Sequence, residues 1–150
     1  QQLNQIYELL ESVECRGTWP TYSDWITECT SHQSELWIFC SDMLDGAESW
    51  RGVRELGETF GHEQLFFQIL GKNELELDFE GVTTVRDPEN QMERTIRASA
   101  VKESYQTNLQ EYLNVLDDAV AGRRSKRELF MMNQPVRDLL RAYLENRSRL

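Results

Sequence analysis

The sequence predicts an α/β fold: a partial, doubly wound parallel sheet of about three strands flanked by helices, plus an antiparallel β-hairpin. Two short apolar runs, Leu36–Ser41 and Gln64–Leu70, have the length and composition of strands that are buried on both faces. Segments with helical spacing of apolar residues alternate with these runs, which indicates crossovers between parallel strands. The 150 residues are of ordinary single-domain size, so we expect one domain over 1–150.

Helical spacing of apolar residues defines the elements around these strands. Thr18 is placed to cap the second helix, with Pro20 in its first turn, and Ser99 is placed to cap a long helix that ends near Gly122. Pro135 opens the last helix, whose apolar residues we expect to face inward. In chain order, the predicted helices cover residues 3–13, 18–29, 50–60, 99–122 and 135–144.

The remaining strands are shorter. Glu128–Met132 is the third strand predicted for the sheet. From Glu74 onwards the apolar residues alternate with acidic ones, which favours extended chain with one solvated face. Two polar strands, Val82–Arg86 and Gln91–Arg97, flank the turn residues Asp-Pro-Glu-Asn at 87–90 and predict the hairpin.

Composition narrows the possible partners. The chain has 26 acidic and 16 basic residues and a net charge of −10, which opposes binding to nucleic acid. Cys15, Cys29 and Cys40 are odd in number, and Cys40 falls in a predicted buried strand, so we expect reduced thiols and a cytoplasmic location. No apolar stretch reaches the roughly 20 residues of a membrane helix, so no membrane segment is predicted in this chain.

Asp42 is the strongest functional candidate. It follows the apolar run Leu36–Ser41 directly, and ligand sites of open α/β sheets lie at the carboxyl ends of such strands. The alternative is structural: Asp42 is equally well placed to cap the helix that follows. Ser41 lacks the glycine pattern of a nucleophile elbow, and no set of residues supplies acid, base and nucleophile, so we expect no enzymatic activity.

Several segments together resemble a known family. They are Ser41–Asp45, the run Leu75–Gly81, the hairpin, and Leu140–Leu144 with the basic tail after it. In this order they are similar to the carboxyl-terminal half of bacterial proteins of domain-of-unknown-function family 58, which are von Willebrand factor A-like. The resemblance implies that 1–150 is the second half of such a domain, without its first strands, and many relatives carry membrane segments before this point.

The resemblance also implies a site and a partner. In von Willebrand A-like domains, oxygen ligands from three loops hold a divalent cation, Mg²⁺ or Mn²⁺, and such hard cations favour oxygen donors. Thr18 matches the threonine of the second loop and Asp42 the aspartate of the third, whereas the Asp-x-Ser-x-Ser of the first loop is absent from the sequence. The partner that the family implies is a MoxR-type AAA+ ATPase, encoded beside its members.

Two other residue groups have simpler interpretations. His32 and His62 lack partners at metal-ligand spacing, so we expect surface or loop positions for both. The basic cluster at 123–127 directly follows the long helix, where cations favourably meet the helix dipole. A solvated helix end is the favoured interpretation, and a docking patch for an acidic partner is the alternative.

Three hypotheses for function follow. The favoured one is a non-catalytic protein-interaction module, assisted by a cation at Thr18 and Asp42. The second is a phosphoryl-accepting, receiver-like domain, although the carboxylates and the lysine that such chemistry needs are not evident. The third is a structural assembly domain without metal. Because no strand precedes Leu36–Cys40, that strand is expected at an open sheet edge and predicts homo-oligomers.

Overall fold

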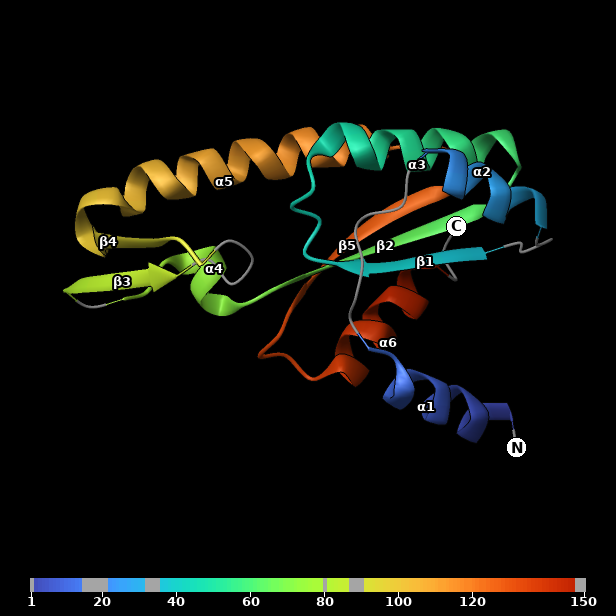
Figure 1. Cartoon of the computed structure of the whole chain (residues 1–150), viewed down its shortest axis with the longest axis horizontal. Helices are drawn as coiled ribbons and strands as arrows, with labels where there is room; N and C mark the ends of the chain where they lie inside the picture. Colours follow the sequence, from blue (N-terminus) through green and yellow to red (C-terminus); the bar gives the residue numbers. More distant parts are fainter. Residues whose placement is uncertain (1, 15–21, 32–35, 80, 87–90, 148–150) are drawn as a thin grey trace.

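The computed structural model describes residues 2–14, 22–31, 36–79, 81–86 and 91–147, and its elements are labelled in Figure 1. The helices are α1 (Gln2–Ser12), α2 (Tyr22–Ser31), α3 (Ala47–Thr59), α4 (Lys72–Glu76), α5 (Ala98–Val120) and α6 (Val136–Arg147). The strands are β1 (Leu36–Ser41), β2 (Glu63–Leu70), β3 (Val82–Arg86), β4 (Glu93–Arg97) and β5 (Ser125–Met131).

The described strands form two sheets, which confirms the predicted fold class. One is a three-stranded sheet in the order β1-β2-β5, and the other is the antiparallel hairpin of β3 and β4. In the first sheet both pairs of strands are parallel: Ile38 of β1 is in register with Leu65, and Phe66 of β2 with Arg127 of β5. Parallel pairing places the carboxyl ends of all three strands at the same end of the sheet.

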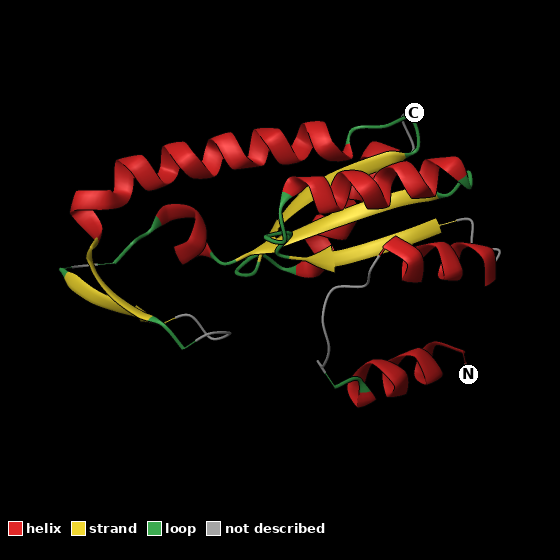
Figure 2. Ribbon diagram, turned by 45° about the horizontal axis from the view of Figure 1, so that its top comes forward, coloured by secondary structure: helices red, strands yellow, loops and turns green. Residues whose placement is uncertain are grey.

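Helices cover both faces of the parallel sheet (Figures 1 and 2). α3 and the carboxyl-terminal half of α5 pack on one face, where Phe66 of β2 meets Trp50 and Leu116. α6 covers the other face, where Tyr143 packs edge-on against Phe67 with ring centroids 5.7 Å apart. Helices therefore flank the sheet on both faces, and alternate residues of β2 are buried against opposite layers.

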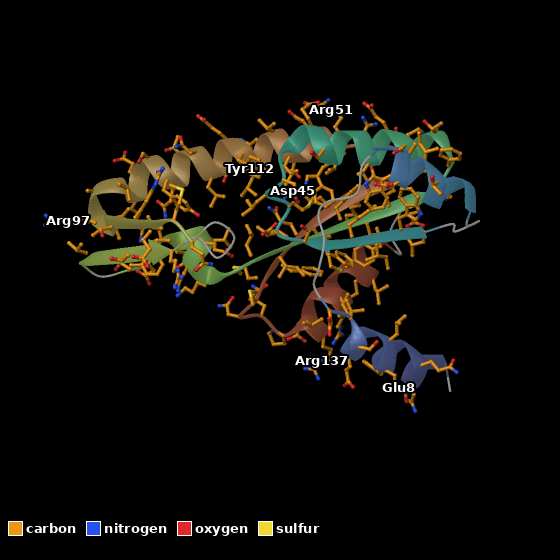
Figure 3. The ribbon with its side chains drawn as sticks, viewed as in Figure 1. Glu8, Asp45, Arg51, Arg97, Tyr112 and Arg137 are labelled. Atoms are coloured by element: carbon orange, nitrogen blue, oxygen red, sulfur yellow. The ribbon has the colours of Figure 1, made fainter. Side chains whose placement is uncertain are left out.

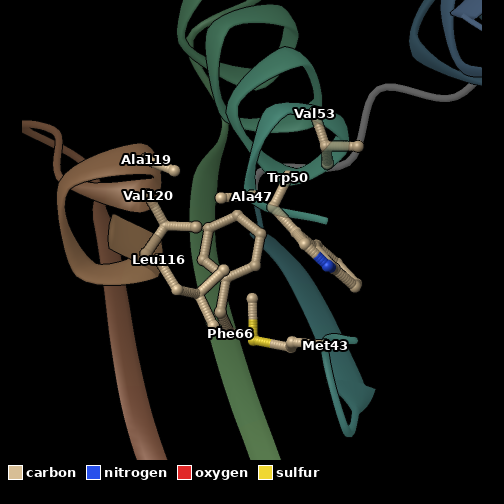
Figure 4. Close-up of a cluster of buried hydrophobic side chains, with 8 residues drawn as sticks. All are labelled: Met43, Ala47, Trp50, Val53, Phe66, Leu116, Ala119 and Val120. Carbon is tan, nitrogen blue, oxygen red and sulfur yellow. The ribbon is translucent and has the colours of Figure 1, made fainter. Parts of the chain in front are cut away.

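The main core lies between β2, α3 and α5 (Figure 4). Phe66 is fully buried and stacks on Phe39 of β1 with a centroid distance of 5.0 Å. Trp50 meets Phe66 at right angles, so the contact combines buried area with the favoured edge-to-face geometry. The side chain of Met43 enters the same cluster from the loop after β1.

β1 is not buried on both faces, and this part of the strand prediction is wrong. Trp37 and Phe39 pack against the core, whereas Ile38 is 55% exposed and Cys40 is also exposed. The physical reason is that β1 lies at the sheet edge, and α6 packs over Leu65 and Phe67 of β2 instead. Sequence alone does not distinguish a central apolar strand from one whose second face lacks a cover.

The chain after β2 also differs from expectation. Residues 72–76 form the short helix α4, although alternation had predicted extended chain from Glu74. The Glu74 carboxylate accepts a hydrogen bond from the Gly71 N–H, so the turn is stabilised locally. Leu77, with φ of 47°, ends the helix and is buried. A local cap therefore outweighs a short alternating pattern.

The hairpin lies apart from the parallel sheet, under the amino-terminal half of α5 (Figures 1 and 2). α5 has 23 residues and reaches from the hairpin to the sheet core. Tyr105 of α5 donates a hydrogen bond to the Glu74 carbonyl, which ties α4 to this helix. Between these elements is an open hollow of about 750 Å³ that apolar side chains mostly line, among them Phe79, Ile96 and Val101.

Three smaller expectations are corrected. The long helix begins at Ala98, so Ser99 lies inside it and is not its cap. His62 does lie in a loop, between α3 and β2, but it is buried and not at the surface, with its ring stacked on Trp37 at a centroid distance of 4.8 Å. The last helix buries Tyr143 but leaves Leu144 59% exposed, so its apolar residues are only partly covered. None of the helices in the described part of the chain is both long and apolar enough to span a bilayer.

Gly57 of α3 lies close to the side chain of Gln64 on β2. A Cβ added there would lie 2.7 Å from Oε1 of Gln64, whose side chain is fully buried and donates a hydrogen bond from Nε2 to the Arg54 carbonyl. We expect Gly57→Ala to lower the free energy of unfolding by about 1–3 kcal/mol through overpacking. Chemical denaturation measures this change.

The matched control is Gly52→Ala in the same helix, where an added Cβ meets nothing within 4 Å. Alanine favours the helix there, so the control should be more stable than the parent by about 0.5–1 kcal/mol. Equal effects of the two substitutions would contradict the close contact between α3 and β2.

Candidate functional site at the loop after β1

The candidate site is the loop Asp42–Gly46, which joins β1 to α3 at the carboxyl ends of the parallel strands. Asp42 and Asp45 are exposed, and Met43 between them is fully buried. Figure 3 shows Asp45 on this loop beneath Tyr112 of α5. The loop therefore presents acidic side chains at the place where α/β sheets bind ligands.

The loop folds on its own polar side chains. Oδ1 of Asp42 accepts a hydrogen bond from the Leu44 N–H at 3.1 Å, and Oγ of Ser41 accepts one from the Met43 N–H at 3.0 Å. These are the local turns that Asp and Ser favour. The alternative interpretation of Asp42 as a helix cap is wrong, because α3 begins at Ala47 and Gly46 is its N-terminal flanking residue.

Two residues of the loop have left-handed backbone conformations. Gly46 has φ of 88°, which glycine adopts without steric cost. Met43 has φ of 61°, which is unusual for a residue with a side chain, and such conformations persist only where the surroundings hold them. Met43 is held by its side chain, which is buried among Trp50, Phe66 and Leu116.

A buried glutamine supports the loop from β2. Gln68 is fully buried, and its Nε2 donates a hydrogen bond to the backbone carbonyl of Asp42 at 2.9 Å. Its Oε1 accepts a hydrogen bond from Nη1 of Arg127 on β5 at 2.5 Å. Arg127 in turn pairs with Asp117 of α5, with Nη2 and Oδ2 2.6 Å apart. A chain of polar contacts thus connects β2, β5 and α5 to the loop.

Arg127 corrects the interpretation of the basic cluster as a solvated helix end. It lies within β5, and its side chain is only 9% exposed. Its charge is compensated by Asp117 and by the amide oxygen of Gln68, as a nearly buried guanidinium requires. Arg123 and Arg124 do lie in the connection after α5 and are exposed.

Tyr112 of α5 holds the second carbonyl of the loop. Its hydroxyl donates a hydrogen bond to the Met43 carbonyl at 2.5 Å. Partial burial raises the pKa of Tyr112 above its ordinary value of 10, the Gly46 backbone opposes this shift, and the charges of Asp45 and Asp42 add to it. The hydroxyl is therefore protonated, and able to donate, at neutral pH.

The oxygen donors that the structure describes do not by themselves make a cation site. Asp42 and Ser41 offer suitable oxygens, but both already accept hydrogen bonds from the loop backbone. Within residues 2–14, 22–31, 36–79, 81–86 and 91–147, no group of three or more His, Cys, Asp or Glu residues is placed to hold a metal ion. Thr18, the other predicted ligand, and His32 lie outside the described residues.

Sequence reasoning found Asp42 but missed the residues that position it, namely Gln68, Tyr112 and Arg127. Gln68 did carry a signal, because it is a polar residue inside an otherwise apolar strand, where an amide needs buried partners. Comparisons of the chain with protein-family models, with curated proteins and with solved structures gave no match.

The hydrogen bond from Tyr112 to the Met43 carbonyl should stabilise the folded chain. Tyr112→Phe removes one hydrogen bond to the loop, so we expect the free energy of unfolding to fall by about 1 kcal/mol at neutral pH. Since folding raises the pKa of Tyr112, its contribution is fully present below the unfolded-state pKa of 10 and is lost as pH rises through the higher folded-state value. The difference between parent and variant should therefore shrink above pH 10.

Urea denaturation at a series of pH values measures this difference. Tyr7→Phe is the control, because Tyr7 is 58% exposed on α1 and should leave the stability unchanged. A Tyr112→Phe protein as stable as the parent at neutral pH would show that the hydroxyl does not support the loop.

Proposed function

We propose that this chain is a non-catalytic protein-interaction module whose partner binds the loop Asp42–Gly46. The observation that carries the proposal is that the backbone of the loop is held by buried groups while its acidic side chains are exposed. Its backbone carbonyls at Asp42 and Met43 are held by Gln68 and Tyr112, while the carboxylates of Asp42 and Asp45 remain exposed. Rigid support of exposed charged groups is typical of binding sites.

The proposed partner is basic, or is bridged by a divalent cation. Asp42 and Asp45 make this edge of the sheet negative, which favours cationic side chains of a partner. The resemblance to von Willebrand A-like proteins suggests a MoxR-type AAA+ ATPase as the partner and Mg²⁺ or Mn²⁺ at Asp42. Since a cation would have too few ligands from the described residues, the remaining oxygens must come from Thr18 or from the partner.

The edge of β1 supports a second candidate function, self-assembly. β1 pairs only with β2, so it is an edge strand of the described sheet. The strand Leu36–Ser41 has no charged residue, whereas the opposite edge strand β5 carries Lys126, Arg127 and Glu128. Charges protect an edge strand from pairing with another chain, so β1 is the less protected edge.

Asp42→Asn tests the first function. The substitution removes one charge and keeps an oxygen that can accept the Leu44 hydrogen bond, so the fold should be unaffected. We expect binding to a purified MoxR-type ATPase to weaken by about tenfold or more in biolayer interferometry, with Mg²⁺ present.

Glu93→Gln on the hairpin is the matched control, since it removes the same charge from another exposed site. Binding that is equally strong for the parent and Asp42→Asn would argue against the loop as the interface. If chelation of Mg²⁺ left the affinity of the parent unchanged, the cation would be removed from the proposal.

Ile38→Lys tests self-assembly through β1. Lysine at this 55% exposed position places a charge on the open edge and should convert oligomers to monomers in light scattering. Val115→Lys on the exposed face of α5 has a similar change of side chain at 50% exposure and should leave the oligomeric state as in the parent. A parent protein that is monomeric at high concentration would rule this function out.

A further inference from the structure

A second charged surface lies at the opposite end of the parallel sheet from Asp42. A pocket of about 420 Å³ opens at the amino ends of β2 and β5, and it does not include any residue of the loop after β1. The side chains and backbone around it belong to three segments: Glu63–Leu65 of β2, Gly122–Lys126 at the start of β5, and Tyr143 of α6. Arg123, Arg124 and Lys126 make it basic within a chain of net charge −10.

The backbone of this basic pocket is fixed before any ligand arrives. The Arg124 carbonyl accepts a hydrogen bond from the Gln64 N–H at 2.7 Å, and Oγ of Ser125 donates one to the Val120 carbonyl at 2.7 Å. The Arg123 N–H donates to Oε1 of Glu58 at 3.2 Å. Gly122 allows the Glu58 carboxylate to approach the backbone closely, because a Cβ there would collide with it unless the carboxylate moved.

The charges in the pocket are not equally available. Lys126 is paired with Glu128 at 2.6 Å and lies 5.3 Å from the centre of the Tyr143 ring. Glu58 is neutralised by Arg54 at 2.7 Å. Among the described residues, no carboxylate lies within 4.0 Å of the guanidinium of Arg123 or Arg124, although acidic residues outnumber basic ones in the chain. Both guanidinium groups therefore keep N–H donors for an external anion, although Arg124 already donates one bond to the Gly61 carbonyl.

The arrangement suits separate carboxylates better than a single phosphate. Phosphate sites typically gather free backbone N–H groups and hydroxyls, but here the Arg123 N–H and the Ser125 hydroxyl already donate to other groups. Arg124 is anchored on one side by donating Nη1 to the Gly61 carbonyl, which leaves its Nε and Nη2 for one bidentate carboxylate. Arg123 is exposed and has no such anchor, so it offers a second, separate contact.

We propose that the basic pocket at Arg123 and Arg124 binds an acidic peptide segment of a protein partner, with carboxylates of the segment paired to the two guanidinium groups. The charge complementarity is local, since the rest of the chain is acidic and repels such a segment. Glu63 on the pocket rim limits how closely the segment approaches that side. This surface is independent of the loop at Asp42, so a partner with both basic and acidic segments could span the sheet from end to end.

Fluorescence anisotropy with a labelled Glu-Gly repeat peptide tests the proposal, with a Gln-Gly repeat as the neutral probe. The parent should bind the acidic peptide and not the neutral one, and added salt should weaken binding. Arg123→Gln together with Arg124→Gln should weaken it by about tenfold or more. Arg94→Gln together with Arg97→Gln is the matched control, because it removes the same charge from two other exposed arginines and should have no such effect.

Several outcomes would overturn the proposal. Equal losses in the two double variants would show that binding follows net charge and not the pocket. Full competition by inorganic phosphate would assign the pocket to a small oxyanion, and a change in oligomeric state in the Arg123 and Arg124 variant would assign it to a second copy of the chain. Asp42→Asn should bind the acidic peptide as the parent does, which keeps this test separate from that of the proposed function.

Discussion

The interaction on which the structure depends is the pair of hydrogen bonds made by the buried amide of Gln68. Its Nε2 donates to the Asp42 carbonyl just after β1, and its Oε1 accepts a hydrogen bond from Arg127 of β5. A buried amide that lost either partner would leave an unsatisfied polar group in the core, which is costly. Gln68 therefore links the pairing of the strands to the position of the loop.

This coupling explains why an unusual loop conformation is stable. Met43 has a left-handed backbone, yet its side chain fills the core and its carbonyl is bound by Tyr112. The carboxylates of Asp42 and Asp45, on either side of Met43, remain exposed. The opposite end of the sheet follows the same design: the turn at Arg123 and Arg124 is fixed by backbone hydrogen bonds while its charges face outward. The carboxyl end of the parallel sheet is therefore acidic, and its amino end is basic.

Most of the architecture was accessible from the sequence, and most of the site was not. Apolar runs and turn residues predicted the parallel strands, the hairpin and the helices, because those signals are local. Other features depend on which elements pack together. They are the open face of β1, the burial of His62 and the place of Arg127 in β5. That information is distributed over distant residues. Asp42 was predictable from its place after a strand, but Gln68 lies 26 residues from Asp42 along the chain, and Tyr112 lies 69 residues from Met43.

Gln68 should hold the loop Asp42–Gly46 in a single conformation. Amide hydrogen exchange of Met43 and Leu44, measured by nuclear magnetic resonance in the parent and in Gln68→Met, tests it most directly. Methionine keeps the length of the side chain and removes both of its hydrogen-bonding groups. We expect both amides to exchange slowly in the parent and much faster in the variant, while α3 keeps its protection. Fast exchange in the parent, or identical loop exchange in the two proteins, would contradict it.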